Sequence, residues 1–138
     1  MQSAGASSLA SSLGIATGAV VQEVGRDEDS AEEVRSAFIE ASGAELVDFD
    51  YTDVVDAVLL WFREDDDDLV DLLVDVISPL ADNGVVWLMT PKPGRDGHVP
   101  PAEISDAAPT AGLQTTRTLS ASAHWQGTRL VTPKSGRR

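Results

Sequence analysis

Cysteine is absent from the 138-residue sequence. Its absence excludes disulfide bonds, thiolate zinc sites, iron–sulfur clusters and a cysteine nucleophile. Long apolar segments are also absent, because no run approaches the roughly 18 residues that a membrane-spanning helix needs. The first 14 residues carry no charged side chain and no continuous apolar core, so they lack the pattern of a secretion signal. We therefore expect a cytoplasmic protein without a membrane partner.

Basic residues are scarce. The sequence has 10 Lys and Arg residues against 23 Asp and Glu residues, and its formal net charge is −13. Residues 23–75 hold 19 acids and 3 bases, a balance of −16, whereas residues 82–138 hold 4 acids and 7 bases, a balance of +3. An acidic body repels phosphates over a Debye length of about 10 Å, so we expect no direct binding to nucleic acid. The same field favours basic protein surfaces, although it also serves solubility alone.

Helices are predicted where apolar residues recur every three or four positions and where a glycine follows the pattern. Ser30 and Glu33 have the spacing of a capping box at the start of one helix. Its buried face is predicted to carry Val34, Ala37, Phe38 and Ala41. The four predicted helices are Ser7–Leu13, Ser30–Ala41, Leu69–Leu80 and Ala102–Ala111.

Strands are predicted from short apolar runs bounded by turn residues. The two most apolar runs, Val54–Phe62 and Val85–Met89, are typical of strands buried on both faces. A turn at Asn83–Gly84 precedes the second run, and a turn around residues 125–127 joins the last two strands. The remaining predicted strands are Ala19–Val24, Ala44–Asp48, Leu113–Ser122 and Thr128–Thr132.

The alternation of strands and helices indicates right-handed βαβ units and a mainly parallel sheet of about five or six strands. The last two strands form an antiparallel hairpin. The fold class is therefore α/β: a single small, Rossmann-like, methyltransferase-like domain of three layers. We expect this domain over residues 13–133. Residues 1–12 form a flexible or short-helical N-terminus, and residues 134–138 form a basic disordered tail.

Four stretches of the sequence resemble the DUF3052 family in its actinobacterial form. The most specific motif is W-L-x-T-P-K-x-G-R-D-G-H-V, which spans residues 87–99. The stretches that carry the resemblance are Leu13–Gly25, Ser42–Leu69, Leu80–Val99 and Ala107–Ser135. The resemblance implies a reduced Rossmann-type domain, like a trimmed methyltransferase sheet, in a protein with an accessory or regulatory role. It supplies no catalytic residues.

The loop after the first strand lacks the repeated glycines of a Rossmann cofactor loop. It contains Gly25, followed by three acids at residues 27–29 that would repel a phosphate. At the start of a helix, the same acids complement the helix dipole, and we favour this structural interpretation. A site for S-adenosylmethionine or a nucleotide is the alternative, with Asp48 or Asp50 as the acid at the end of the second strand.

The acidic run at residues 64–68 offers oxygen ligands of the kind that Ca²⁺ and Mg²⁺ prefer. It lacks the alternate spacing and central glycine of a calcium-binding loop, so a helix cap explains it better. Serine catalysis has no support, because the sequence contains no G-x-S-x-G motif. We predict no catalytic residue, metal or cofactor.

The best candidate binding surface is the loop after the second central strand, since open α/β sheets bind ligands outside the carboxyl ends of their strands. This loop holds Lys92, Arg95, Asp96 and His98. Lys92 and Arg95 suit an anion or an acidic peptide, and His98 suits a base near neutral pH. The alternative is an Arg95–Asp96 network that only orders the loop.

Trp125 and Arg129, in the terminal hairpin, complete the candidate binding residues, because Trp and Arg are enriched at binding hot spots. Core packing is the more common role of a tryptophan at such a position, and Trp61 and Trp87 lie within apolar strands.

These features favour a non-enzymatic regulatory or protein-binding module, with a basic protein partner such as part of the transcription machinery. The alternative is a degenerate S-adenosylmethionine- or nucleotide-binding, methyltransferase-like protein. A homodimer, formed through the edge strand of the terminal hairpin, is a further possibility.

Overall fold

The structure is a computed structural model, and it describes residues 4–48, 50–64 and 68–132. The helices are α1 (Ala4–Leu13), α2 (Glu32–Ser42), α3 (Leu69–Ile77) and α4 (Pro101–Thr110). The strands are β1 (Val21–Val24), β2 (Val55–Trp61), β3 (Leu80–Pro91), β4 (Gln114–Ser120) and β5 (Trp125–Val131). They form one sheet in the order β1-β2-β3-β5-β4. β1, β2 and β3 are parallel, and β5 is antiparallel to both β3 and β4. The predicted α/β class, with its terminal antiparallel hairpin, is confirmed.

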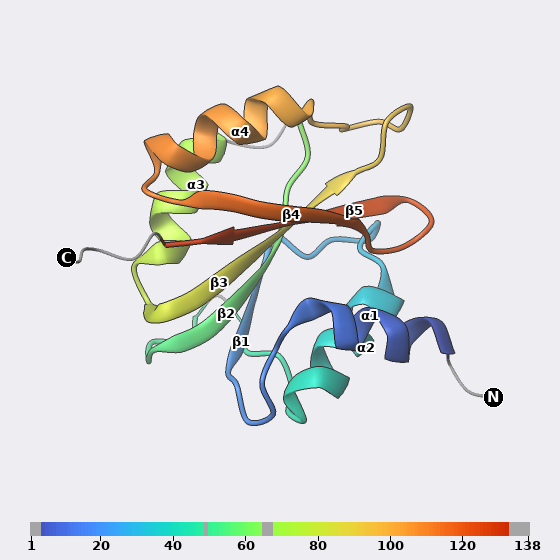
Figure 1. Cartoon of the computed structure of the whole chain (residues 1–138), viewed down its shortest axis with the longest axis vertical. Helices are drawn as coiled ribbons and strands as arrows, with labels where there is room; N and C mark the ends of the chain where they lie inside the picture. Colours follow the sequence, from blue (N-terminus) through green and yellow to red (C-terminus); the bar gives the residue numbers. More distant parts are fainter. Residues whose placement is uncertain (1–3, 49, 65–67, 133–138) are drawn as a thin grey trace.

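The helices cover the sheet in pairs, which gives three layers (Figure 1). α1 and α2 pack on one face, over a cluster that includes Leu13, Phe38 and Trp87. α3 and α4 pack on the other face, over a cluster that includes Leu73 and Leu88. Successive side chains of a strand point to opposite faces. The central strands β2 and β3 therefore need apolar residues at nearly every position, as the two apolar runs predicted. No helix in the described part of the chain is long and apolar enough to cross a membrane.

The predicted buried face of α2 is confirmed, but the predicted capping box is wrong. The helix begins at Glu32, and its N-cap residue, Ala31, has no side chain that can accept a hydrogen bond. The Ser30 hydroxyl instead accepts the Asp27 N–H at 2.9 Å, and so closes the turn before the helix. At the other end, Gly43 adopts φ 78° and donates its N–H to the Ile39 carbonyl, as the predicted glycine stop requires.

The predicted turn at Asn83–Gly84 is wrong, and the helix predicted to reach Leu80 ends at Ile77. β3 runs without interruption from Leu80 to Pro91. Its register against β2 shifts, because Val55 faces Leu80 whereas Ala57 faces Val85. Five steps along β3 thus match two steps along β2. At Gly84, a Cβ would lie 2.4 Å from the Leu80 side chain. The turn residues therefore serve a bulge inside a strand, where the chain folds too closely on itself for a side chain.

The terminal hairpin turns earlier than predicted. Residues 121–124 form the connection, and Trp125 already belongs to β5, where it pairs with Pro91 of β3. The predicted turn around residues 125–127 is therefore wrong. The reason is the packing against the neighbouring strand β3, where a Cβ on Gly127 would lie 3.0 Å from the Met89 side chain and 3.2 Å from the Trp87 side chain. Gly127 is a strand residue that makes room for two large side chains of β3.

Thr90, near the end of β3, is fully buried. Within the described residues, its hydroxyl is the one buried side-chain polar atom that has no hydrogen-bond partner. A buried hydroxyl without a partner costs free energy, and an apolar group of the same shape does not. We therefore expect Thr90→Val to raise the free energy of unfolding by about 1 kcal/mol in urea titrations. Thr118→Val, at an exposed position of β4, should change it by less than about 0.5 kcal/mol. A destabilised Thr90→Val variant would contradict the assignment.

Candidate functional site

The sheet changes its direction of winding at β1. After β1, the chain passes through α2 to Val47, which forms an isolated parallel bridge with Gln22 of β1. It then crosses to the other side of β1 and forms β2. The predicted strand Ala44–Asp48 is thus reduced to a single bridge. Open α/β sheets hold ligands outside the carboxyl ends of the strands at such a switch point. In this chain the crevice lies beyond Val24 and Trp61.

Side chains of the protein itself fill this crevice. Arg63 follows β2, and its guanidinium binds both carboxylate oxygens of Asp29, with 3.0 Å between Nε and Oδ2. The same guanidinium donates to the Gly25 carbonyl oxygen at 3.1 Å and lies 5.3 Å from the centre of the Trp125 ring. We refer to Asp29, Trp61, Arg63 and Trp125 as the crevice cluster. It joins the ends of β1, β2 and β5.

The two tryptophans of the crevice cluster are buried and satisfied. Trp61 and Trp125 pack edge to face, with ring centres 4.8 Å apart and an interplanar angle of 81°. The Trp125 indole N–H donates to the Asp29 carbonyl oxygen at 3.0 Å, and the Trp61 indole N–H donates to Glu23 Oε2 at 2.9 Å. Aromatic pairs of this geometry contribute about 0.5–1.5 kcal/mol beyond the area they bury. The packed rings and their two hydrogen bonds thus close the crevice.

Beneath the cluster, Glu23 of β1 and Arg35 of α2 form a two-bonded ion pair, with nitrogen–oxygen distances of 2.7 and 3.0 Å. The hydrogen bond to Glu23 raises the pKa of Arg35, against the effect of burial. Glu32 accepts hydrogen bonds from Arg26 and Arg35, and its bond with Arg26 is the main cause of its lowered pKa. We refer to residues 23–75 as the acidic half. Each of its arginines is paired with a carboxylate; these are Arg26, Arg35 and Arg63.

Gly25 is the single glycine of the loop after β1, where a Rossmann fold would hold its cofactor, and packing requires a glycine there. It adopts φ 84°, and a Cβ there would lie 2.4 Å from the Trp61 carbonyl oxygen. The prediction that residues 27–29 begin a helix is wrong, because α2 begins three residues later, at Glu32. Asp48 is exposed and accepts the Asp50 N–H at 3.0 Å. The loop after β1 therefore forms a turn that packs closely against the end of β2.

The structure brings three of the candidate binding residues together at one hollow on this edge. Arg95, Asp96 and Trp125 line a hollow of about 450 Å³, with Asp29 and His124 also in its wall. Arg95 and Asp96 are exposed, and no ion pair joins them in the described part of the chain. Trp125 is only 3% exposed, so its ring forms the floor of the hollow and belongs to the core. Of the two predicted roles of Trp125, core packing is therefore the one that the structure shows.

Lys92 and His98 hold this loop in place. The Lys92 ammonium donates to the Ser120 hydroxyl of β4. His98 Nδ1 lies 2.9 Å from the Pro91 carbonyl oxygen. A carbonyl only accepts, so Nδ1 carries the hydrogen and Nε2 is the nitrogen left for another contact. Both residues therefore order the loop that presents Arg95.

Arg129 lies away from this edge. It pairs with Trp87 in the middle of β3, and it lines a different hollow, at the amino ends of β1 and β2. The sequence grouped it with Trp125 because four residues separate them, but a strand carries those four residues over about 13 Å. Arg63 and Asp29 were not predicted as site residues. The scarcity of arginine in the acidic half was the available signal for them.

In the described part of the chain, no group of three or more His, Asp or Glu side chains is arranged to hold a metal ion. Asp68 caps α3, since its carboxylate accepts the N–H groups of Val70 and Asp71 at 2.8 and 3.3 Å. This is the role predicted for the acidic run. Its residues 65–67 lie outside the described residues, as does the predicted basic tail.

Comparison with known proteins places the chain in a family. Residues 10–134 match the model of a protein family of unknown function, DUF3052. The chain belongs to this family. Uncharacterised proteins of Mycobacterium tuberculosis and Mycobacterium bovis are each 52% identical to it over 130 residues, which cover 94% of this chain and 82% of theirs.

Solved structures with the same fold are S-adenosylmethionine-dependent methyltransferases. One from Aquifex aeolicus superposes with a TM-score of 0.58 and 14% identity, over 91% of this chain and 88% of the other. The CcbJ methyltransferase of Streptomyces caelestis gives a TM-score of 0.61 and 11% identity, over 93% and 89% of the two chains. At these identities the likeness concerns the fold, which is the predicted Rossmann-like, methyltransferase-like one.

Asp29 links the stability of the crevice cluster to pH. The hydrogen bond from Arg63 lowers the pKa of Asp29 below its ordinary value, against a smaller effect of burial. A carboxyl whose pKa is lower in the folded state stabilises the fold above its unfolded pKa, near 3.9, and loses this contribution as the pH falls. We therefore expect Asp29→Asn to lower the melting temperature at pH 7, and the difference from the native protein to shrink as the pH falls below about 4.

Because only the difference between the two proteins is compared, the titration of the other carboxylates cancels. Asp27→Asn is the matched control, since Asp27 is exposed and forms no ion pair among the described residues. A difference for Asp29→Asn that stayed constant from pH 7 to pH 3 would contradict the role of the ion pair.

Proposed function

We propose that the protein is a non-catalytic regulatory module that binds another protein and uses the methyltransferase-like fold without its cofactor. One observation carries the proposal: the crevice cluster fills the switch point at which this fold class holds a nucleotide or S-adenosylmethionine. Arg63 occupies the position between the ends of β1 and β2, and two tryptophans pack behind it. A ligand would have to displace a hydrogen-bonded cluster whose two tryptophans are buried.

The charge of this surface favours a basic partner. The three arginines of the acidic half each neutralise a carboxylate, and the acids that outnumber them keep this part of the chain negative. Glu28, in the loop after β1, and Glu33, in the first turn of α2, are exposed and take part in no ion pair within the described residues. Complementary charge of this kind steers association and selects partners. Arg95, on the neighbouring loop, adds a donor for backbone or carboxylate oxygens.

A degenerate S-adenosylmethionine site is the competing function, and it is supported by the fold and by the position of Asp48 after the Val47 bridge. A ligand of the native state must raise the melting temperature. We expect no rise with S-adenosylmethionine, S-adenosylhomocysteine or ATP at about 1 mM, which would stabilise a protein with a micromolar site by roughly 4 kcal/mol. A saturable rise in the native protein would replace our proposal with the competing one.

The protein partner is tested by capture from the native host with tagged protein and mass spectrometry. We expect a basic partner that the native protein enriches and that Glu28→Lys/Glu33→Lys loses. Glu103→Lys/Asp106→Lys makes the same change in net charge at exposed positions of α4, on the other face, and should retain the partner. Equal loss with both double variants would mean that only net charge matters, and would contradict a binding surface at the crevice.

A further inference from the structure

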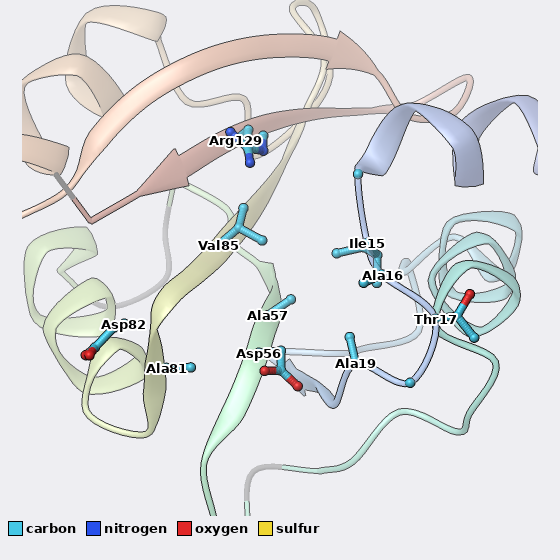
Figure 2. A pocket seen from close by; sticks show the side chains of 12 residues that line it. Ile15, Ala16, Thr17, Ala19, Asp56, Ala57, Ala81, Asp82, Val85 and Arg129 are labelled. Atoms are coloured by element: carbon cyan, nitrogen blue, oxygen red, sulfur yellow. The ribbon is translucent and has the colours of Figure 1, made fainter. Parts of the chain in front are cut away.

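A second hollow opens at the amino ends of the parallel strands, on the face that α1 and α2 cover. Its volume is about 510 Å³, and we call it the amino-edge hollow. Its walls are the connector between α1 and β1, the first residues of β2 and β3, and Arg129 of β5. Figure 2 shows the side chains of Ile15, Ala57 and Val85 around one space, with Arg129 beyond Val85 and Asp56 beyond Ala57.

Two local features of the backbone form this hollow. Gly14 and Gly18 adopt φ values of 68° and 91°, so the connector leaves α1 sharply and runs along the edge of the sheet before β1 begins. On the opposite wall, the register shift of β3 near Gly84 separates the start of β3 from its regular path beside β2. The hollow is therefore set by the backbone. Pockets for small molecules commonly have volumes of about 300–1,000 Å³, and this one lies in that range.

Arg129 gives the hollow a positive rim. It faces Arg117 of β4 across the hairpin, and like charges in directly opposed positions destabilise a sheet. Arg117 lies over the Trp87 ring, 5.7 Å from its centre. Arg129 donates to the Thr116 hydroxyl at 3.2 Å. Neither arginine forms an ion pair with any of the described residues. The two arginines are thus opposed across the hairpin, and neither has an ion-pair partner among the described residues.

This arrangement contrasts with the rest of the molecule. In a chain with 23 acids, the arginines of the acidic half are each paired with a carboxylate, whereas Arg117 and Arg129 are held by a ring face and a hydroxyl. An anion at Arg129 would receive charge-assisted hydrogen bonds and would relieve the repulsion between the two arginines. The rim therefore has the chemistry of a carboxylate site.

The other rim is negative. Asp56 is the one exposed residue within β2, and its Oδ2 accepts the Val20 N–H at 2.8 Å. This bond turns the carboxylate toward the start of β1 and leaves Oδ1 for a donor. Figure 2 shows the Asp56 carboxylate at the edge of the hollow, below Ala57, and the side chains of Thr17 and Asp82 pointing away from its centre. A ligand that spans the hollow thus meets a cation at one end, apolar walls in the middle and a carboxylate at the other end.

We propose that the amino-edge hollow binds a small organic acid whose single carboxylate pairs with Arg129, whose body is apolar and whose far end is a hydrogen-bond donor. This site lies at the opposite edge of the sheet from the crevice cluster, so the inference goes beyond the proposed function and stands without it. The net charge of −13 repels anions elsewhere on the surface, so binding of an acid requires a local positive site.

Three probes of equal chain length separate the parts of this proposal: 6-aminohexanoate, hexanoate and adipate, each added to the ¹⁵N-labelled full chain and followed by backbone amide chemical shifts. Ligands of this size bind with dissociation constants on the order of millimolar, so titrations extend to about 20 mM. We expect saturable shifts at residues 14–19 and at Arg129 with 6-aminohexanoate, weaker ones with hexanoate and the weakest with adipate, whose second carboxylate meets Asp56.

Two variants test the site by different means. Arg129→Gln should weaken the binding of 6-aminohexanoate at least about tenfold, whereas Arg95→Gln, with the same change in charge at the other edge, should leave it unchanged. Ala16 is exposed and lines the hollow, so a tryptophan there should fill the hollow. Ala16→Trp should therefore abolish binding while the residue at position 129 remains arginine. The Ala16→Trp variant keeps the proposal falsifiable if Arg129→Gln fails to fold, which the dispersion of the amide spectrum shows directly.

The absence of saturable shifts in the native protein would overturn the proposal. Unchanged binding in Arg129→Gln or in Ala16→Trp would overturn the placement of the site. Adipate binding as tightly as 6-aminohexanoate would overturn the assignment of a donor to the far end. Loss of the protein partner in the capture experiment has no bearing on any of these outcomes, because the two sites lie at opposite edges.

Discussion

The guanidinium of Arg63 is the contact on which the carboxyl edge of the sheet depends. It joins three segments that are distant in sequence, through the Gly25 carbonyl, the Asp29 carboxylate and the Trp125 ring. Arginine suits this position because its planar group both donates in several directions and stacks on an aromatic face. Without this side chain, the Asp29 carboxylate would lose its partner and the Trp125 ring would face an open crevice. The loop after β1, the end of β2 and the start of β5 are thus fixed together.

The methyltransferase-like fold of this chain does not depend on an open crevice at the switch point. The order of the strands and the switch point at β1 are retained, since they follow from the winding of the chain and from the buried faces of β2 and β3. The crevice cluster occupies the space outside the strand ends. The single glycine of the loop is retained for packing against Trp61. The architecture and the ligand site of a fold are therefore separable properties.

The sequence predicted the features that depend on neighbours along the chain. The buried face of α2 followed from periodicity, and Gly43 marked its end because a left-handed residue is needed there. The failures share a cause, which is competition from distant partners. Asn83–Gly84 became a bulge because β2 pairs on both sides of it, and Trp125 joined β5 because Pro91 lies opposite. The ion pair of Arg63 with Asp29 spans 34 residues, and no local pattern encodes such a contact.

The strand β5 connects the two edges that carry the candidate sites. Trp125, at its start, forms the floor of the hollow beside the crevice, and Arg129, four residues on, forms the rim of the amino-edge hollow. β5 is paired with β3 on one side and with β4 on the other, so its backbone is held along its length between two strands. Gly127, between the two sites, is packed against Met89 and Trp87, and this leaves the strand little freedom to flex between them. β5 therefore holds the two sites apart, one at each edge of the sheet.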